Sequence, residues 1–383
     1  MRSLLHYNKN LNSITNIYHD LHNGVMSDWR KRGKKQGDVV YFPYISEKTA
    51  ALAEQVYLWD VDKTYLDTKF ESLKGLWRTA TEKAQSKKNI PGTAELVRCL
   101  SDFHKPHNSL ETFPVFFITA SPPQIENKIY QKLRIDGVEP YGIFCKDNLE
   151  NLRPRKLWKI TKHVGYKMQA LLQMRVFLNE DVRLVMFGDD GETDAVIYNL
   201  FSDVCARRIE SADIRRVLNH FSVLDNQVDY ILRLQDLCPA NDPVEKIYIN
   251  LAEDTDADYY LKFGRRTVPT YNAFQTALDM VQDERLNPEH ILRVAKKLTG
   301  DFEYSPEELE KSYEEMIRRG VLSLEACERL TPILIDGGVL AEDYSPSVTP
   351  KPISEKQGQT ITKLEGSFDP WVPEHVDYTS EYR

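Results

Sequence analysis

The segment from Val56 to Thr64 constrains this chain more than any other stretch. It reads VYLWDVDKT, so that an apolar run ends at Asp60 and is followed by Asp62. A short apolar run that leads into polar residues is typical of a buried parallel strand, and open α/β sheets bind ligands at the C-terminal ends of such strands. The first carboxylate can act as a nucleophile and the second can transfer a proton. A capped turn with two solvated aspartates is the alternative interpretation.

Two more apolar runs, at 114–118 and 182–187, also end in polar residues. These are hydroxyl side chains after the first run and carboxylates after the second: Thr119, Ser121, Asp189, Asp190 and Asp194. Parallel strands bring all these ends to one edge of a sheet. Clustered carboxylates without His or Cys favour a hard cation, and Mg²⁺ with waters and a phosphate oxygen suits them. Such a site is typical of phosphoryl transfer.

Phosphoryl transfer also calls for a lysine that balances the remaining negative charge. Lys167 opens the helix that precedes the run at 182–187, so it can reach the same edge of the sheet. For any single lysine, a solvated surface charge is the common alternative. Four other lysines compete for the role: Lys63, Lys146, Lys159 and Lys162.

Alternating strands and helices predict an α/β fold with a largely parallel sheet flanked by helices and right-handed crossovers. Further strands are predicted at 141–145, 204–209 and 246–251. Helices are predicted at 69–92, 124–133, 167–177, 195–202 and 212–237. A further helix is predicted to begin after Thr93, which would be its N-cap. The helix at 69–92 is expected to lie over the site.

The chain divides into four predicted regions. An N-terminal extension covers 1–50, an α/β domain 51–265 and a helical region 266–340. The tail 341–383 is rich in Pro, Ser, Thr and charge, so it is expected to be disordered or to wrap loosely on the surface. The basic stretch WRKRGKK at 29–35 is either a solvated turn or a contact for anionic lipid head groups or a phosphate.

Composition narrows the functional class. The 383 residues are 41% hydrophobic and carry a net charge of −8, which argues against stable nucleic-acid binding driven by bulk charge. Five scattered cysteines without a Cys-x-x-Cys pair favour reduced thiols and a cytoplasmic location. The N-terminus lacks the apolar core of a signal peptide, and no run approaches the ~18 apolar residues of a membrane span. The oligomeric state stays open.

Four motifs follow one another along the chain: Asp-x-Asp-x-Thr at 60–64, Thr119, Lys167 and Gly-Asp-Asp-x-x-x-Asp at 188–194. In this order they resemble the four motifs of the haloacid dehalogenase-like (HAD) phosphohydrolases, over roughly residues 54–210. Within that superfamily the chain is similar to the catalytic domain of the actin-patch phosphatidate phosphatase and its bacterial relatives. The stretches that carry this likeness are ITASPPQ (118–124), GYKMQALL (165–172) and VMFGDDGETDAVIY (185–198). The resemblance implies a Rossmann-like HAD fold. Because the gaps where this superfamily inserts caps are short, we expect a small cap or none, with a helical C-terminal extension.

The resemblance also implies catalytic roles. Asp60 would be the nucleophile that forms an aspartyl-phosphate, and Asp62 would protonate the leaving alkoxide and later activate water. Thr119 would bind the phosphoryl group and Lys167 would neutralise it. Two hydroxyl residues would support the loops and the substrate: Thr64, which braces the nucleophile turn, and Ser121.

The same resemblance implies a metal site. Asp189 would ligate Mg²⁺ together with Asp60 and the backbone carbonyl of Asp62. Asp190 or Asp194 would support the metal, and no other cofactor is expected. The chain differs from the residues usual in this family at three places. It has Thr-Ala-Ser at 119–121 instead of Ser-Asn-Ser, Asp at 190 instead of Ser, and Ala-Val at 195–196 instead of Pro-Glu.

These observations predict a Mg²⁺-dependent phosphomonoester hydrolase, with phosphatidate or another lipid phosphate as its first candidate substrate. One alternative is a phosphatase for a nucleic-acid end or a soluble phosphorylated metabolite. Another is a non-catalytic scaffold with the same fold, although every expected polar position is occupied. A dehalogenase is a weaker alternative, because such enzymes lack the second aspartate that Asp62 supplies.

Overall fold

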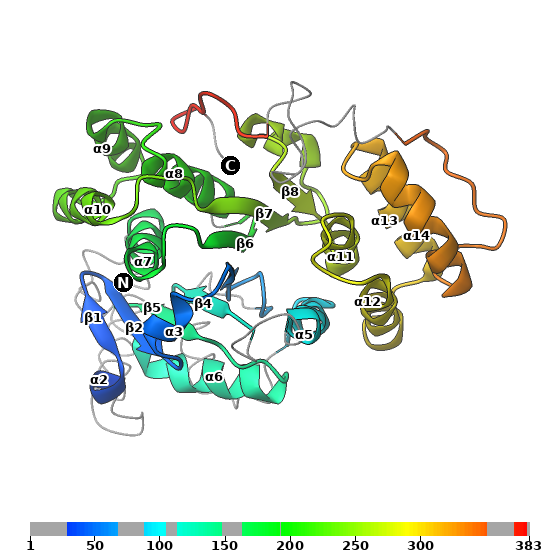
Figure 1. The fold of residues 1–383 in the computed structure, drawn as a ribbon, viewed down its shortest axis with the longest axis horizontal. Coiled ribbons are helices and arrows are strands. Elements are labelled where there is room, and N and C mark those ends of the chain that lie inside the picture. The colour runs from blue at the N-terminus through cyan, green and yellow to red at the C-terminus, as the bar shows by residue number, and fades with distance from the viewer. Residues whose placement is uncertain are drawn as a thin grey trace, which may run out of the picture.

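A computed structural model describes residues 29–67, 88–104, 113–147, 163–191, 193–350 and 371–380. Within these ranges the strands form an eight-stranded sheet in the order β1-β2-β5-β4-β3-β6-β7-β8 (Figure 1). Their bounds are β1 Lys34–Gln36, β2 Val39–Pro43, β3 Gln55–Asp60, β4 Val115–Thr119, β5 Gly142–Lys146, β6 Arg183–Asp189, β7 Val244–Asn250 and β8 Thr267–Thr270.

The strand β3 lies near the middle of the sheet and is parallel to both neighbours, β4 and β6. Trp59 of β3 is level with Phe117 and Phe187 on the two sides, and its ring stacks on Phe187 at a centroid distance of 3.6 Å. The pairs β4–β5, β6–β7 and β7–β8 are also parallel, whereas β1–β2 and β2–β5 are antiparallel. Apolar residues run continuously through β3 and β4 because both faces of these strands are buried.

Helices cover both faces of the sheet. One apolar core joins the sheet to α5, α6 and α11–α14, and a second joins it to α7–α10. Figure 1 shows α7–α10, in green, in the left half of the molecule and α11–α14, in yellow to orange, in the right half. The bounds are α2 Trp29–Arg32, α3 Glu47–Ala50, α5 Thr93–His104, α6 Glu126–Ile135, α7 Val164–Phe177, α8 Asp194–Cys205, α9 Ser211–His220, α10 Asp225–Leu237, α11 Ala273–Gln282, α12 Pro288–Asp301, α13 Pro306–Arg318 and α14 Leu324–Asp336, with 3₁₀ helices η3 Pro123–Ile125 and η6 Ala257–Phe263.

The strands predicted to begin near residues 55, 114, 141, 182 and 246 are present as β3, β4, β5, β6 and β7. The predicted strand at 204–209 is wrong, because α8 continues through Cys205 and Arg207 then adopts φ 59°. Thr93 begins α5 but does not cap it as predicted; its hydroxyl donates to the carbonyl of Ile90 instead. The helix predicted at 69–92 falls almost wholly outside the described residues, which resume at 88.

Strands β1 and β2, which lie within the predicted N-terminal extension, join the main sheet. The turn between them places Gly37 at φ 59°, a backbone conformation that favours glycine. The five cations of the basic stretch 29–35 are exposed, as in a solvated turn, and three of them also pair with nearby acids. Three of its cations form ion pairs of 2.6–2.7 Å: Arg32 with Glu126, Lys34 with Glu47 and Lys35 with Asp147.

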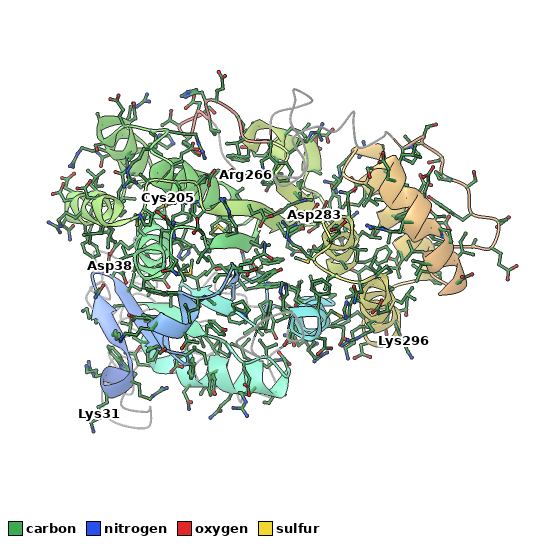
Figure 2. The ribbon with its side chains drawn as sticks, in the orientation of Figure 1. Lys31, Asp38, Cys205, Arg266, Asp283 and Lys296 are labelled. Atoms are coloured by element: carbon green, nitrogen blue, oxygen red, sulfur yellow. The ribbon has the colours of Figure 1, made fainter. Side chains whose placement is uncertain are left out.

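The C-terminal part of the chain returns to the domain. Residues 371–380 belong to the tail that the sequence predicted to be disordered or loosely wrapped, yet Tyr378 is buried and donates to Asp203 at 2.6 Å. The carbonyl of Trp371 accepts from the N–H of Arg266, whose buried guanidinium lies inside the fold (Figure 2). The five cysteines are buried free thiols. Within the described ranges no helix has the length and apolar character needed to cross a membrane.

Candidate active site

The C-terminal edge of the sheet gathers the residues that the sequence singled out. Asp60, Thr119 and Asp189 are the last residues of β3, β4 and β6. Lys167 lies in the first turn of α7 and Asp194 opens α8, so both helices begin at the same edge. All five side chains are buried. Parallel pairing produces this arrangement, because it carries the ends of three neighbouring strands to one place.

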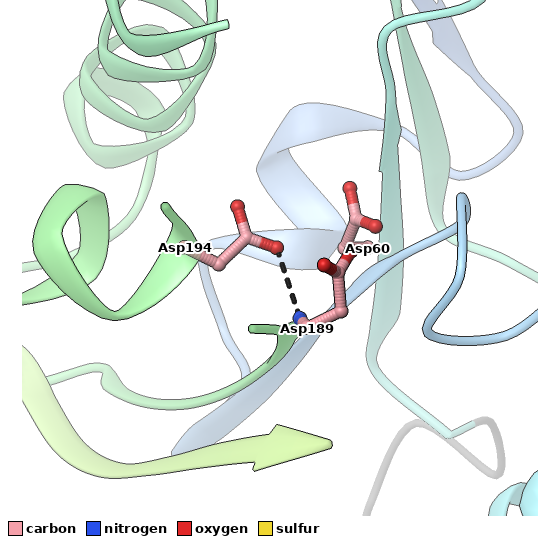
Figure 3. Close-up of side chains that lie close together, drawn as sticks. All are labelled: Asp60, Asp189 and Asp194. Carbon is pink, nitrogen blue, oxygen red and sulfur yellow. Dashed lines mark hydrogen bonds between the residues drawn. The ribbon is translucent and has the colours of Figure 1, made fainter. Parts of the chain in front are cut away.

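Three carboxylates form the centre of the site. Ligand oxygens of Asp60, Asp189 and Asp194 lie within 4.8 Å of one another, and none of the three residues is more than 2% exposed (Figure 3). The backbone N–H of Asp189 donates to Asp194 Oδ2 at 3.3 Å, which links the end of β6 to the start of α8. Buried carboxylates at this spacing repel one another unless positive charge is present.

Lys167 supplies one of the positive charges. Its Nζ lies 2.8 Å from Asp60 Oδ1 and 2.5 Å from Asp194 Oδ1, and the side chain is fully buried. One ammonium against three carboxylates leaves a net negative charge. A hard divalent cation fits this set of oxygen donors.

Of the other candidate lysines, Lys63 also lies beside the site: a Cβ at Gly191 would stand 3.3 Å from its Nζ and 2.9 Å from Asp189 Oδ1. Lys146 belongs to β5, and Lys63 is half-buried in the acidic turn at φ 62°. Lys159 and Lys162 fall outside the described residues. Lys167 forms ion pairs with two members of the carboxylate cluster, Asp60 and Asp194.

The turn after β3 is held to the end of β4 by backbone and side-chain hydrogen bonds. The N–H of Val61 donates to the carbonyl of Ile118, continuing the ladder one residue past β3. Thr64 Oγ1 donates to Asp60 Oδ2 at 3.1 Å, which links this hydroxyl to the carboxylate at the end of β3. Thr119 Oγ1 donates to Asp62 Oδ2 at 2.6 Å, so the second carboxylate is tied to the end of β4.

Ser121 contributes its backbone rather than its hydroxyl to the contacts seen at this edge. Its N–H donates to Thr119 Oγ1 at 3.0 Å. Because a hydroxyl can accept one hydrogen bond while it donates another, Thr119 is fixed from both sides. The loop after β4 therefore orients Thr119, which in turn orients Asp62.

Asp190 contacts the segment after β7. The sequence placed it among possible metal ligands, but its Oδ2 accepts hydrogen bonds from the N–H of Ala252, at 2.9 Å, and from the hydroxyl of Thr255, at 2.5 Å. Asp190 therefore ties the loop after β6 to the loop after β7. Between the two acids that the sequence left open, the geometry favours Asp194, which lies in the carboxylate cluster.

Gly188 is required by a close approach within the site. A Cβ atom at this position would lie 2.4 Å from the Cβ of Asp194 and 2.6 Å from its Oδ2. Real Cβ atoms do not approach other atoms so closely, so any larger residue would displace Asp194. The glycine thus lets the first turn of α8 pack directly against the end of β6.

Two buried tyrosines flank the site as neutral hydrogen-bond donors. Burial raises the pKa of Tyr198 well above its usual value, and the nearby Asp194 carboxylate raises it further. Burial likewise raises the pKa of Tyr166. Their hydroxyls donate to the carbonyls of Phe187 and Phe144, which anchors α8 and α7 to the sheet.

A pocket of 190 Å³ adjoins the carboxylates. The loop after β6 and the first turn of α8 line one wall of it, including Asp189 and Asp194. The opposite wall comes from the segment after β7 and carries Thr255 and three aromatic residues: Tyr259, Tyr260 and Phe263. This wall could not be predicted from the sequence, because nothing in the spacing of residues 251–263 links it to the acidic motifs.

A comparison with protein families bears on the identity of this domain. The family described as phosphatidate phosphatase APP1, catalytic domain, matches residues 55–216. The match supports the phosphatidate phosphatase family. The matched range runs from β3 into α9 and contains every residue of the candidate site: Asp60, Asp62, Thr64, Thr119, Ser121, Lys167, Asp189, Asp190 and Asp194. Searches among curated proteins and among solved structures found no match.

Proposed function

We propose that this chain is a Mg²⁺-dependent phosphomonoester phosphatase of the HAD type that acts on phosphatidate or a related lipid phosphate. The observation that carries the proposal is the buried cluster of Asp60, Asp189 and Asp194 with Lys167, inside a segment matched by a phosphatidate phosphatase catalytic domain. The substrate follows from that match and not from the geometry of the cluster alone.

Asp60, Asp189 and Asp194 would hold the metal, with the backbone carbonyl of Asp62 as a further donor. When bound, Mg²⁺ screens the carboxylates from the phosphoryl oxygens and offsets the negative charge that develops during transfer. Lys167 contributes a fixed positive charge from the protein side, between Asp60 and Asp194. This arrangement lets an anionic phosphate approach an otherwise negative site.

In the first step a carboxylate oxygen of Asp60 attacks phosphorus and an aspartyl-phosphate forms. The bond from phosphorus to the alcohol oxygen breaks, and its electron pair stays on that oxygen. Protonated Asp62 gives the alcohol its proton. Thr64 holds the Asp60 carboxylate in place, and Thr119 holds Asp62.

In the second step Asp62, now ionised, takes a proton from water. The water oxygen attacks phosphorus, and the bond from phosphorus to Asp60 breaks. Inorganic phosphate and a free Asp60 carboxylate result. The hydrogen bond from Thr119 supports this exchange of roles, because it keeps Asp62 at the same position whether the carboxyl group is protonated or ionised.

The test is phosphate release from an aryl phosphate, phosphatidate, a 5′-phosphorylated oligonucleotide and a sugar phosphate, each with Mg²⁺ and with chelator. We expect metal-dependent release with phosphatidate preferred, and its loss in Asp60→Asn. Asp229→Asn, a surface aspartate paired with Arg215, is the matched control and should behave as wild type.

Each outcome separates the alternatives. A preference for the oligonucleotide or the sugar phosphate would replace the lipid assignment. Release that persists in Asp60→Asn would refute the nucleophile assignment. Absence of release from all four substrates, with Mg²⁺ giving no thermal stabilisation of the wild type, would favour a non-catalytic scaffold.

A further inference from the structure

Lys63 adopts a backbone conformation that suits a glycine better than a lysine. Its φ is 62°, in the left-handed region, where a residue with a Cβ raises the free energy of the folded chain. The N–H of Lys63 donates to the carbonyl of Leu66 at 2.9 Å, so the turn is closed by the backbone and needs no side chain at this position. Strained residues of this kind cluster at functional sites, which points to a use for the lysine side chain.

The Lys63 ammonium lies beside Asp189. A Cβ added at Gly191 would stand 3.3 Å from Lys63 Nζ and 2.9 Å from Asp189 Oδ1, so the two atoms border the same point. Because Gly191 has no side chain, the loop after β6 leaves room for the ammonium there. Lys63 is half-buried, whereas Asp60, Asp189 and Lys167 are buried. Lys63 therefore belongs to the outer, solvent-accessible part of the site.

The charges of the site leave a task for such a cation. Mg²⁺ and Lys167 together carry as much positive charge as the carboxylates of Asp60, Asp189 and Asp194 carry negative charge. A phosphomonoester group brings a further charge of about −1.5 to −2 near neutral pH. Attraction of that anion calls for positive charge beyond what the buried cluster holds, and Lys63 carries one such charge at its outer edge.

We propose that Lys63 is a substrate-binding residue whose ammonium contacts the phosphoryl oxygens. The inference rests on the proposed function, since it assumes that the phosphoryl group enters the metal site beside Asp60. The two lysines then have separate roles: Lys167 offsets the buried carboxylates, and Lys63 offsets the charge that the substrate brings. The Lys63 ammonium also repels a cation at Asp189. Removal of this ammonium should therefore weaken phosphate binding and strengthen Mg²⁺ binding.

Lys63→Met tests these two effects by isothermal titration calorimetry of the full chain. The dissociation constant of inorganic phosphate, measured with Mg²⁺ saturating, should rise about tenfold, as expected for the loss of a charged hydrogen bond. The dissociation constant of Mg²⁺ without phosphate should fall about threefold or more, because a nearby positive charge is removed. Lys63→Arg, which keeps the charge, should bind both ions within about threefold of wild type.

A second pair of variants separates the side chain from the strained backbone. Glu303 is the matched control, because it is exposed between α12 and α13 and has a φ of 61°. Lys63→Gly and Glu303→Gly should both unfold at a urea concentration no lower than that of wild type, since glycine adopts this φ without strain. We expect Lys63→Gly, and not Glu303→Gly, to lose affinity for phosphate. These two variants also decide the assignment if Lys63→Met does not fold.

The binding measurements distinguish failure of the Lys63 assignment from failure of the proposed function. If wild type hydrolyses an aryl phosphate but Lys63→Met binds phosphate and Mg²⁺ as wild type does, the Lys63 assignment is overturned and the phosphatase assignment stands. If wild type binds both ions but hydrolyses no phosphomonoester, the proposed function fails, and opposite shifts of the two affinities would still support Lys63 as an anion contact. If wild type binds no phosphate, the Lys63 assignment is overturned.

Discussion

The charge balance of the site is tested most directly by Lys167→Met. The Lys167 ammonium is fully buried, 2.8 Å from Asp60 and 2.5 Å from Asp194. Methionine is close to lysine in length, so the substitution removes the charge with little change in packing. Removing one partner of a buried ion pair costs about 3–5 kcal/mol, because the remaining charges stay buried without compensation. We expect the free energy of unfolding to fall by that amount in chelator.

Two further measurements show whether electrostatics causes the loss. Asp194→Asn in the same chain removes one of the uncompensated charges, so the double variant should recover part of the loss, about 0.5–3 kcal/mol of coupling. Mg²⁺ should also restore stability, by ~2.7 kcal/mol at a concentration 100 times its dissociation constant. Urea unfolding gives the free energy of unfolding of the single and the double variant, each with and without Mg²⁺.

The control for this series is Lys296→Met, since Lys296 is exposed on α12 and lies at the periphery of the fold (Figure 2). It should unfold within about 0.5 kcal/mol of wild type. Phosphate release by Lys167→Met should fall at least about 100-fold, as expected when a charge aimed at the transferring group is lost. If Lys167→Met is as stable in chelator as Lys296→Met, the buried-pair reasoning is wrong.

Two other predictions concern packing and pH. Gly188→Ala should lower the free energy of unfolding by about 1–3 kcal/mol and reduce phosphate release, because the new methyl group would meet Asp194 at 2.4 Å. At Gly300, in α12, an added Cβ would meet no atom within 4 Å, so Gly300→Ala should instead raise the free energy of unfolding by about 0.5–1 kcal/mol. Equal effects of Gly188→Ala and Gly300→Ala in urea unfolding would contradict the packing reasoning. Asp242→Asn tests pH dependence: burial acts to raise the pKa of Asp242, but Arg266 and a second arginine outweigh it, and the pKa is lowered. A carboxyl whose pKa is lower in the folded state stabilises above its unfolded pKa of about 3.9 and loses that contribution as pH falls through the folded pKa. The free energy of unfolding, measured from pH 7 to pH 3, should therefore be lower for Asp242→Asn than for wild type, and this difference should shrink as pH falls. A difference that stays constant with pH would contradict a lowered pKa of Asp242.

The central strands could be predicted from sequence because each is a continuous apolar run that ends in a charged or hydroxyl residue. The run at 204–209 misled for the same reason. It begins with the short apolar stretch 204–206 before two arginines, and periodicity cannot distinguish the end of a buried helix such as α8 from a strand. Strand β8 was missed because four residues that include Pro269 give little signal for a strand. The hairpin β1–β2 was missed although Gly37 marks its turn.

The candidate site followed from sequence wherever the residues stand at the end of a strand or the start of a helix. Asp60, Thr119 and Asp189 meet for that reason, and Lys167 joins them because α7 begins at the same edge. The contacts of Asp190 could not be predicted, since its partner Thr255 lies 65 residues away and after another strand. The aromatic wall of the pocket was hidden by the same long separation.

The central position of β3 has a consequence for how the chain folds during synthesis. β3 ends at Asp60, whereas its partners begin at Val115 and Arg183. At about 5–20 residues per second, roughly 6–25 s separate the synthesis of Asp60 from that of the β6 neighbour. For that interval the buried strand β3 has at least one edge without its native partner. Slower translation between residues 60 and 183 would lengthen the exposure of this edge to aggregation and to chaperones.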